Sequence, residues 1–278
     1  MPEPPPVTSA TFAIYLPVRI LSNTPVYQNL STGISKIDNS LRHIYPLTAC
    51  RVGGYITLAT YSCIYSQFRL CNQPVNQIDL ATTLLGKAAN TSRFFVAIAG
   101  PPASGKTTLS ESLANALAKE TSVSVVAMDG FHYDNNILEE FGLLDRKGSP
   151  NTFDVAGLHL LLSGLQNQSE TIAAPVFDRE RDLARSSAKL IYPEDHIILV
   201  EGNYLLCETE PWNALHSFFN TTISLDTPIQ VIEERLIQRW LDHDHTLEQA
   251  KRRTQFNDLP NAEYVIKNSI AAQYTICN

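Results

Sequence analysis

The feature that most constrains this chain is residues 100–107, which read Gly-Pro-Pro-Ala-Ser-Gly-Lys-Thr and match the spacing G-x-x-x-x-G-K-[ST]. A short apolar run at 94–99 precedes the motif, as expected of a buried parallel strand. Residues 108–119 follow with apolar side chains at helical spacing and no glycine or proline. The sequence therefore predicts a strand, a glycine-rich turn and a helix, an order in which backbone N–H groups converge on a phosphate.

The residues of this loop have separate expected roles in holding a nucleoside triphosphate. Lys106 is expected to reach the β- and γ-phosphates, and the Thr107 hydroxyl to bind a Mg²⁺ ion that bridges them. A chance glycine turn before a helix is the alternative, and the flanking strand and helix argue against it. The other expected nucleotide-binding residues are Gly100, Pro101, Pro102, Ala103, Ser104, Gly105 and Thr108.

Charge, hydropathy and cysteine content exclude other classes of protein. The net charge of −7 argues against a nucleic-acid partner, because such domains are usually basic. The longest uncharged window, 52–68, is too short to span a bilayer, and prolines rather than a signal sequence follow Met1. The five cysteines form no C-x-x-C pair and look like reduced thiols. We expect a cytoplasmic protein with no membrane partner, and a homodimer stays open because the sequence does not identify an oligomeric state.

The chain divides near residue 75. Residues 1–74 carry a net charge of +3, which leaves −10 for the remainder, and they show no sustained helical or strand period. Three interpretations compete for this head: a poorly ordered leader, an organelle-targeting segment, or upstream sequence read from a misplaced start codon. Few early arginines weaken the second. We favour a low-order extension, 1–75, without a catalytic role, followed by a catalytic domain, 76–278.

Short apolar strands alternate with helices after residue 75. Strands are expected at 94–99, 123–128, 196–200 and 222–225, and helices at 108–119, 158–165, 229–240 and 247–256, with another helix leading into the first strand. We expect glycine to end the helix at 158–165. This alternation predicts an α/β fold: a three-layer α/β/α sandwich with a mostly parallel sheet, whose ligands bind at the carboxyl ends of the strands.

Two carboxylates follow predicted strands and carry the expected chemistry. Asp129 follows the second strand, where it can accept the proton of an acceptor hydroxyl. A turn Asp before glycine is an equal alternative. Glu201 ends the next buried strand, where a carboxylate reaches magnesium, and its alternative is a surface acid capping the strand.

Countercharge and acceptor recognition have less specific candidates. Arg235 and Arg239 lie one helical turn apart and suit phosphate oxygens, as does the pair at 252–253, although a solvated helix face is as good an interpretation of each. The polar segments 145–154 and 175–182 look like acceptor-recognition loops or a lid, with solvent-facing loops as the alternative. His243 and His245 lack a third metal ligand at suitable spacing, so we interpret them as solvated loop residues.

Together these motifs resemble the uridine kinase, phosphoribulokinase and pantothenate kinase superfamily of P-loop NTPase-fold kinases. The resemblance covers about residues 76–270, and within the superfamily it is strongest to bacterial nucleoside/nucleotide kinase-like proteins, some labelled fructose-transport-system kinases. The first 75 residues have no counterpart in that pattern. The motifs that carry the resemblance are 100–107, Met-Asp-Gly-Phe-His at 128–132, Lys-Gly-Ser-Pro at 147–150, Phe-Asp at 153–154, Pro-Val-Phe-Asp-Arg at 175–179 and Val-Glu-Gly-Asn at 200–203.

The resemblance implies a kinase that uses Mg-ATP to phosphorylate a hydroxyl of a small molecule. It implies that Asp129 is the catalytic base beside Lys106 and Arg239, and that Arg235 and Arg239 lie at a lid. A nucleoside, a sugar or a pantothenate-like alcohol all remain open as acceptors, and His132 and Asn135 argue against a committed uridine kinase. The residues implied to bind the acceptor are Asp129, His132, Phe153, Asp178 and Arg179.

Two other functions compete with a kinase. One is a nucleotide-hydrolysing P-loop NTPase switch, although the N-K-x-D string that reads guanine is absent. The other is a non-catalytic nucleotide sensor that keeps the loop for binding only. A sensor has no need of Asp129, so its presence beside Lys106 and Glu201 favours the enzyme.

Overall fold

The computed structural model describes residues 51–52, 55–56, 77–167 and 169–278, and contacts divide the chain into two units, 1–69 and 70–278. In the first unit, strands β1 (Arg51–Val52) and β2 (Tyr55–Ile56) pair antiparallel. Apart from that pairing, the expectation for residues 1–75 lies outside the described residues.

The second unit is built on a five-stranded sheet in which every neighbouring pair is parallel, in the order β4-β7-β3-β8-β9. The strand that precedes the glycine loop, β3, lies at the centre of this order. The α/β class and the mostly parallel sheet are therefore confirmed. In chain order the strands are β3 (Phe94–Ala99), β4 (Val123–Ala127), β7 (Ile197–Gly202), β8 (Thr221–Asp226) and β9 (Tyr274–Cys277).

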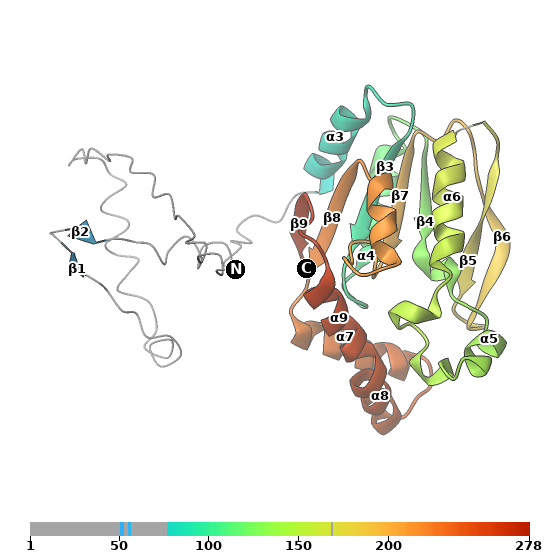
Figure 1. The fold of residues 1–278 in the computed structure, drawn as a ribbon, viewed down its shortest axis with the longest axis vertical. Coiled ribbons are helices and arrows are strands. Elements are labelled where there is room, and N and C mark those ends of the chain that lie inside the picture. The colour runs from blue at the N-terminus through green and yellow to red at the C-terminus, as the bar shows by residue number, and fades with distance from the viewer. Residues whose placement is uncertain (1–50, 53–54, 57–76, 168) are drawn as a thin grey trace, which may run out of the picture. The chain divides into compact units, whose positions relative to one another are not determined.

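Helices surround this sheet in the three-layer arrangement (Figure 1). At the lower end of Figure 1, α7, α8 and α9 lie together, and α6 lies on the side of β4. The α-helices are α3 (Gln77–Ala88), α4 (Lys106–Leu117), α5 (Asn135–Glu140), α6 (Val155–Asn167), α7 (Ile229–Asp242), α8 (Leu247–Arg253) and α9 (Leu259–Asn268). Short turns are η3 (Met128–Phe131), η4 (Leu144–Arg146), η5 (Pro150–Thr152), η6 (Trp212–Phe218) and the π-helical η7 (Thr254–Asp258).

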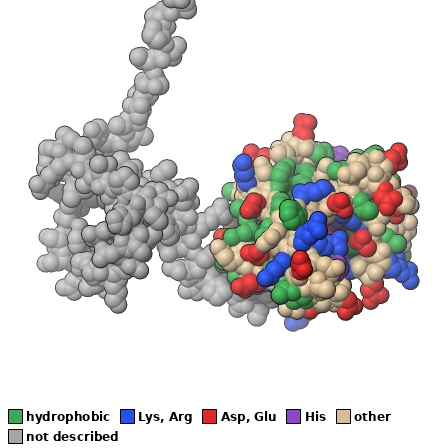
Figure 2. Space-filling view, turned by 90° about the horizontal axis from the view of Figure 1, so that it is seen from below, with side chains coloured by type: hydrophobic (Ala, Val, Ile, Leu, Met, Phe, Trp, Pro, Cys, Tyr) green, Lys and Arg blue, Asp and Glu red, His purple; other side chains and the backbone are tan. Residues whose placement is uncertain are grey.

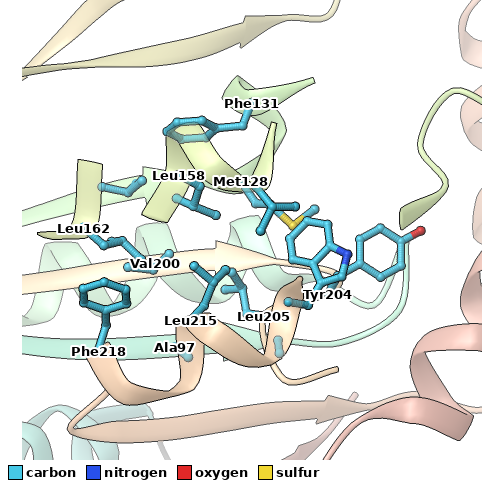
Figure 3. Packing of buried hydrophobic residues seen from close by; sticks show 14 of the residues in the cluster. Ala97, Met128, Phe131, Leu158, Leu162, Val200, Tyr204, Leu205, Leu215 and Phe218 are labelled. Carbon is cyan, nitrogen blue, oxygen red and sulfur yellow. The ribbon is translucent and has the colours of Figure 1, made fainter. Parts of the chain in front are cut away.

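Alternating side chains of the central strands fill two separate cores, because successive residues of a strand point to opposite faces. Phe95 and Ala97 of β3 pack in one core with α6 and η6, whereas Val96 and Ile98 pack in the other with α3 and α4. Figure 3 shows the first core, in which Leu158 and Leu162 face Val200, and Met128 packs nearby. Burial on both faces explains why these strands read as continuous apolar runs.

The segment expected to be polar loops near 175–182 forms a β-hairpin instead. Strands β5 (Ile172–Asp178) and β6 (Leu183–Ile191) pair antiparallel, with a register shift between Ala174 and Val176. The hairpin is mostly half-exposed, so its outward face tolerates the polar residues that suggested loops. Only the turn, 179–182, matches the loop prediction.

Three element boundaries also differ from expectation. The second strand ends at Ala127, and Asp129 lies in the η3 turn. Gly164 does not end α6, which continues to Asn167; a Cβ there would lie 3.0 Å from Ile172 Cδ1, so glycine permits close packing on β5. The helix predicted at 247–256 changes to π geometry at Thr254.

Two features of the structure, the state of a cysteine and the hydropathy of the helices, relate to the predicted cytoplasmic location of the protein. Cys207 is a buried free thiol, and for the other cysteines the expectation of reduced thiols stays a prediction. Among the helices that the structure describes, none combines the length and hydropathy needed to cross a bilayer. The cytoplasmic location, the absence of a nucleic-acid partner and the open homodimer stay predictions.

Candidate active site

The glycine loop joins β3 to α4 and bends through a left-handed residue. Gly105, at φ +92° and ψ 20°, is the N-cap of α4, a conformation that residues with a Cβ rarely adopt. A Cβ at Gly105 would also lie 2.5 Å from Asn278 Nδ2. The helix therefore begins at Lys106, two residues before the predicted start, and its free N–H groups face the loop.

Lys106 is buried at the base of this loop, with 8% of its surface exposed. Its Nζ donates a hydrogen bond to the Pro101 carbonyl at 2.9 Å. Burial lowers the pKa of Lys106 to about 8, partly offset by the nearby carboxylates Glu201 and Asp129. The ammonium is thus desolvated, and within the described part of the chain no carboxylate is hydrogen-bonded to it, which suits it to bind a phosphate.

Thr107 and Glu201 meet at the other side of the loop. The Thr107 hydroxyl donates to Glu201 Oε1 at 3.1 Å, because β7 runs parallel to β3 and places Glu201 opposite Ile98. Glu201 is 6% exposed, which excludes the surface-acid interpretation. Burial and the neighbouring Asp129 raise the pKa of Glu201, and Lys106 opposes this rise.

Asp129 faces the same space from η3. Its Oδ2 accepts from Arg179 Nη2 at 2.9 Å, and the two side chains are 27% and 54% exposed. Arg179 comes from the turn of the β5–β6 hairpin, 50 residues further along the chain. The structure therefore brings together a carboxylate, Asp129, and a guanidinium, Arg179, that the sequence placed on separate segments.

The two arginines of α7 point to the loop. Arg235 Nη1 donates to the Ala103 carbonyl at 3.2 Å. Burial and the nearby Arg179 lower the pKa of Arg239, while Asp258 and Asp129 oppose the shift. A solvated helix face is therefore the wrong interpretation for Arg239, whereas movement of these arginines as a lid stays a prediction.

One cavity of about 680 Å³ connects these groups. Figure 2 views the unit from the lower end of Figure 1 and shows Lys and Arg side chains gathered near the middle of that face. Of the predicted site residues, the cavity is lined by Pro102, Ala103, Gly105, Lys106, Thr107, Thr108, Asp129, Arg179, Glu201, Arg235 and Arg239.

The remaining predicted acceptor residues, His132, Phe153 and Asp178, are not among the residues that line the cavity. His132 stacks between Phe153 and Phe177, with ring centroids 4.0 and 4.7 Å away, and its Nδ1 donates to the Asp129 carbonyl at 2.8 Å. Burial lowers the pKa of His132. Phe153 is buried, and Asp178 lies 3.5 Å from Arg185 Nε. In this structure these residues support Asp129 and the hairpin, and direct acceptor contact stays a prediction for them.

Sequence reasoning missed several residues that line the cavity. Asn203 follows Glu201 by two positions, so the strand period could have placed it on the same side. Ile276 lies in β9 and Asn278 directly follows that strand, and the sequence analysis predicted no strand there. Asn278 Nδ2 donates to the Ser104 carbonyl at 2.6 Å, and this contact across 174 residues has no local signal.

The interpretation of His243 and His245 as solvated loop residues is correct for His243 but not for His245, which is half-buried. Within the described ranges no cluster of three or more His, Cys, Asp or Glu could hold a metal ion. His243 is exposed, and His245 packs against Trp240 at a centroid distance of 5.1 Å.

The parallel sheet and the loop after its central strand define the class of protein: a P-loop protein, whose loop suits a nucleoside triphosphate. The sequence matches the Phosphoribulokinase / Uridine kinase family over residues 95–270, and the chain belongs to that family, which makes it a small-molecule kinase.

Three known proteins illustrate the relationship. A crystal structure of a candidate fructose transport system kinase from Silicibacter sp. TM1040 has a TM-score of 0.69 at 41% identity, over 72% of this chain and 98% of that one. The uncharacterized protein YggC of Escherichia coli (strain K12) is 33% identical, over 66% of this chain and 77% of YggC. A pantothenate kinase of Parvibaculum lavamentivorans is 31% identical over 74% of this chain, and the match spans only 65% of its length.

Proposed function

We propose that residues 76–278 transfer the γ-phosphate of Mg-ATP to a hydroxyl of a nucleoside, a sugar or a pantothenate-like alcohol. The observation that carries this proposal is that Asp129, Lys106 and Glu201 line the same cavity. A carboxylate that can accept a proton thus shares one space with the groups that hold a triphosphate. A nucleotide switch has no need of this arrangement.

Asp129 is the proposed general base. In the transfer it accepts the proton of the acceptor hydroxyl as the oxygen attacks phosphorus, and ADP leaves from the other side. Lys106 and Arg239 stabilise the negative charge on the transferring group. Because Asp129 Oδ2 is bound to Arg179, the acceptor hydroxyl must approach the free side of the carboxylate or displace the guanidinium.

Thr107 and Glu201 fit a magnesium ion. Magnesium prefers oxygen ligands and is usually held by one or two protein groups together with substrate phosphates. A hydroxyl and a buried carboxylate 3.1 Å apart beside Lys106 provide such a donor set. When bound, the ion supplies countercharge to the β- and γ-phosphates.

The relatives support three acceptor classes. Similarity to a candidate fructose transport system kinase supports a sugar, and similarity to pantothenate kinase supports a pantothenate-like alcohol. The family description supports a nucleoside. The acceptor side of the site is formed by the hairpin turn and by η3, which are the parts that we expect to distinguish these classes.

Magnesium-dependent ADP release tests the proposal. Purified protein and ATP are combined with separate pools of sugars, nucleosides and pantothenate-like alcohols, beside Asp129→Asn. We expect one pool to stimulate release, and Asp129→Asn to lower the rate by about 10²- to 10⁴-fold because general-base help is lost. ATP affinity, measured by calorimetry, should change little.

Two results would contradict the proposal. Slow ADP release that no pool stimulates would favour a nucleotide-hydrolysing switch. An equal loss of ATP affinity and turnover in Asp129→Asn would show that Asp129 holds the metal or the fold.

A further inference from the structure

Lys147 forms the centre of a polar cluster outside the nucleotide cavity. Its Nζ donates to Asn135 Oδ1 at 2.7 Å and to the Asp182 carbonyl at 2.6 Å, and lies 2.9 Å from Asp182 Oδ2. Asn135 Nδ2 also donates to Asp182 Oδ2 at 3.3 Å. The three side chains therefore bind one another in a closed cluster.

The cluster joins three segments that are far apart in the sequence. Asn135 begins α5, Lys147 follows η4, and Asp182 lies in the turn of the β5–β6 hairpin. The Lys147 side chain is 13% exposed, and its Nζ lies 5.3 Å from the centre of the Phe177 ring in the same hairpin. An ammonium that is mostly buried against a ring needs its oxygen partners, since an unpaired buried charge is costly.

Asp182 has an unusual backbone that the cluster holds in place. Its φ is +52°, in the left-handed region that residues with a Cβ enter at a cost. Lys147 binds both the carbonyl and the carboxylate of this residue, so the contact fixes the turn as well as the side chain.

The same turn delivers Arg179 to the active site. Arg179 lies three residues before Asp182, and its guanidinium binds Asp129 at 2.9 Å. The structure shows no cavity-lining role for Lys147, Asn135 or Asp182, which all lie apart from the phosphate loop. The turn thus begins at Arg179, which binds the carboxylate of Asp129, and ends at Asp182, which belongs to the cluster.

We propose that Lys147, Asp182 and Asn135 act as a latch, a set of positioning residues that fixes the hairpin turn so that Arg179 meets Asp129 and the acceptor. The latch sets the affinity for the acceptor and leaves nucleotide binding alone. Its effect on the turn is independent of the reaction, whereas its effect on the acceptor rests on the proposed kinase function.

Hydrogen exchange of the amides of residues 179–183 tests the first part without any acceptor. Asp182→Asn is the main variant, because asparagine tolerates the left-handed backbone and removes only the charge. We expect about three- to tenfold faster exchange in the turn, the loss typical of a partly exposed ion pair. Arg185→Gln is the control: it removes the ion pair between the two strands of the hairpin, at 3.5 Å from Asp178. Because Asp178 Oδ1 can still accept from the Arg181 amide, exchange in the turn should stay within about twofold of wild type.

Lys147→Met and the double variant Lys147→Met/Asp182→Asn complete a double-mutant cycle. Lys147→Met should accelerate exchange at least tenfold, since it removes all three oxygen contacts of the ammonium. The double variant should be no faster than Lys147→Met, because Asp182 then has no cation left to bind. Additive effects in the double variant would overturn the latch, as would unchanged exchange in Asp182→Asn.

Steady-state kinetics with the acceptor pool that stimulates ADP release test the second part. Asp182→Asn should raise the acceptor KM about three- to tenfold and leave the KM for ATP within twofold of wild type. A merely structural cluster would lower both affinities together, and that result would overturn the positioning role. Failure of every pool would contradict the proposed function, while the exchange experiment would still decide whether the latch exists.

Discussion

At the scale of single residues, the decisive fact is that a lysine is buried at the proposed phosphate site. Lys106 lies between two carboxylates, Asp129 and Glu201, and two guanidiniums, Arg179 and Arg239, and burial is the largest influence on its pKa. The desolvated ammonium gains more from a phosphate than a hydrated one would, because it has little water to lose.

A pH dependence of nucleotide affinity follows. In the free protein Lys106 loses its proton as pH rises through its pKa of about 8, and a bound triphosphate raises that pKa. Below pH 8 Lys106 is charged in both the free and the triphosphate-bound protein, so the nucleotide affinity should not depend on pH there. Above pH 8 binding must take up a proton, and affinity should fall by up to about tenfold per pH unit.

Calorimetric titration with a non-hydrolysable ATP analogue between pH 7 and 9.5 measures this fall. Buffers of different ionisation enthalpy should reveal proton uptake above pH 8. Lys106→Met is the control and should bind weakly with no such dependence. A wild-type affinity that stays level to pH 9.5 would show that Lys106 keeps its proton in the free protein.

The sequence predicted the site residues that follow strands and missed those that depend on distant contacts. Glu201 follows an apolar run that reads as a buried strand, and Lys106 belongs to the glycine-loop motif, so local sequence patterns were enough to place both. Asn278 reaches Ser104 from the last strand, and Lys147 reaches Asp182 across 35 residues. Such pairs form only when the chain has folded, so no local pattern announces them.

At the scale of elements, close packing of η3 against β5 holds Asp129 in place. A Cβ at Gly130 would lie 2.5 Å from the Pro175 carbonyl oxygen and 2.8 Å from its carbon. Both atoms belong to the backbone of β5, so they cannot rotate away as a side chain would. Glycine is therefore required because two backbone segments approach closely, and the turn propensity that the sequence suggested is only part of the reason.

Gly130→Ala should for this reason lower both stability and turnover. We expect a loss of about 1–3 kcal/mol in the free energy of unfolding, typical of overpacking, and a lower kcat because Asp129 moves with η3. Urea unfolding and ADP release measure the two effects.

Gly86→Ala is the matched control for that experiment. A Cβ there meets no atom within 4 Å on the exposed side of α3, so the helix should gain about 0.5–1 kcal/mol. Equal stability of the two variants would show that η3 can withdraw from β5 without cost.

At the scale of the whole molecule, both cores are closed by residues of the second unit. The core behind β3 contains Leu80, Leu84 and Ala88 of α3 together with Leu113 and Leu117 of α4. Across the sheet, α6 and η6 close the other core. Arg93, directly before β3, ties α6 to the segment between β6 and β7, because its guanidinium donates to the carbonyls of Leu165, Tyr192, Pro193 and Asp195.

A chain of residues 76–278 should therefore fold and phosphorylate as the full chain does. A chain that begins at residue 90 is the control, since it keeps the site but loses α3. Removing Leu80 and Leu84 costs about 1.5–3 kcal/mol each in lost burial, a large part of the stability of an ordinary domain. Urea unfolding and ADP release should show a stable, active 76–278 and an unstable 90–278. An inactive 76–278 would mean that residues 1–75 contribute to the site, and a stable 90–278 would mean that α3 contributes little to the core.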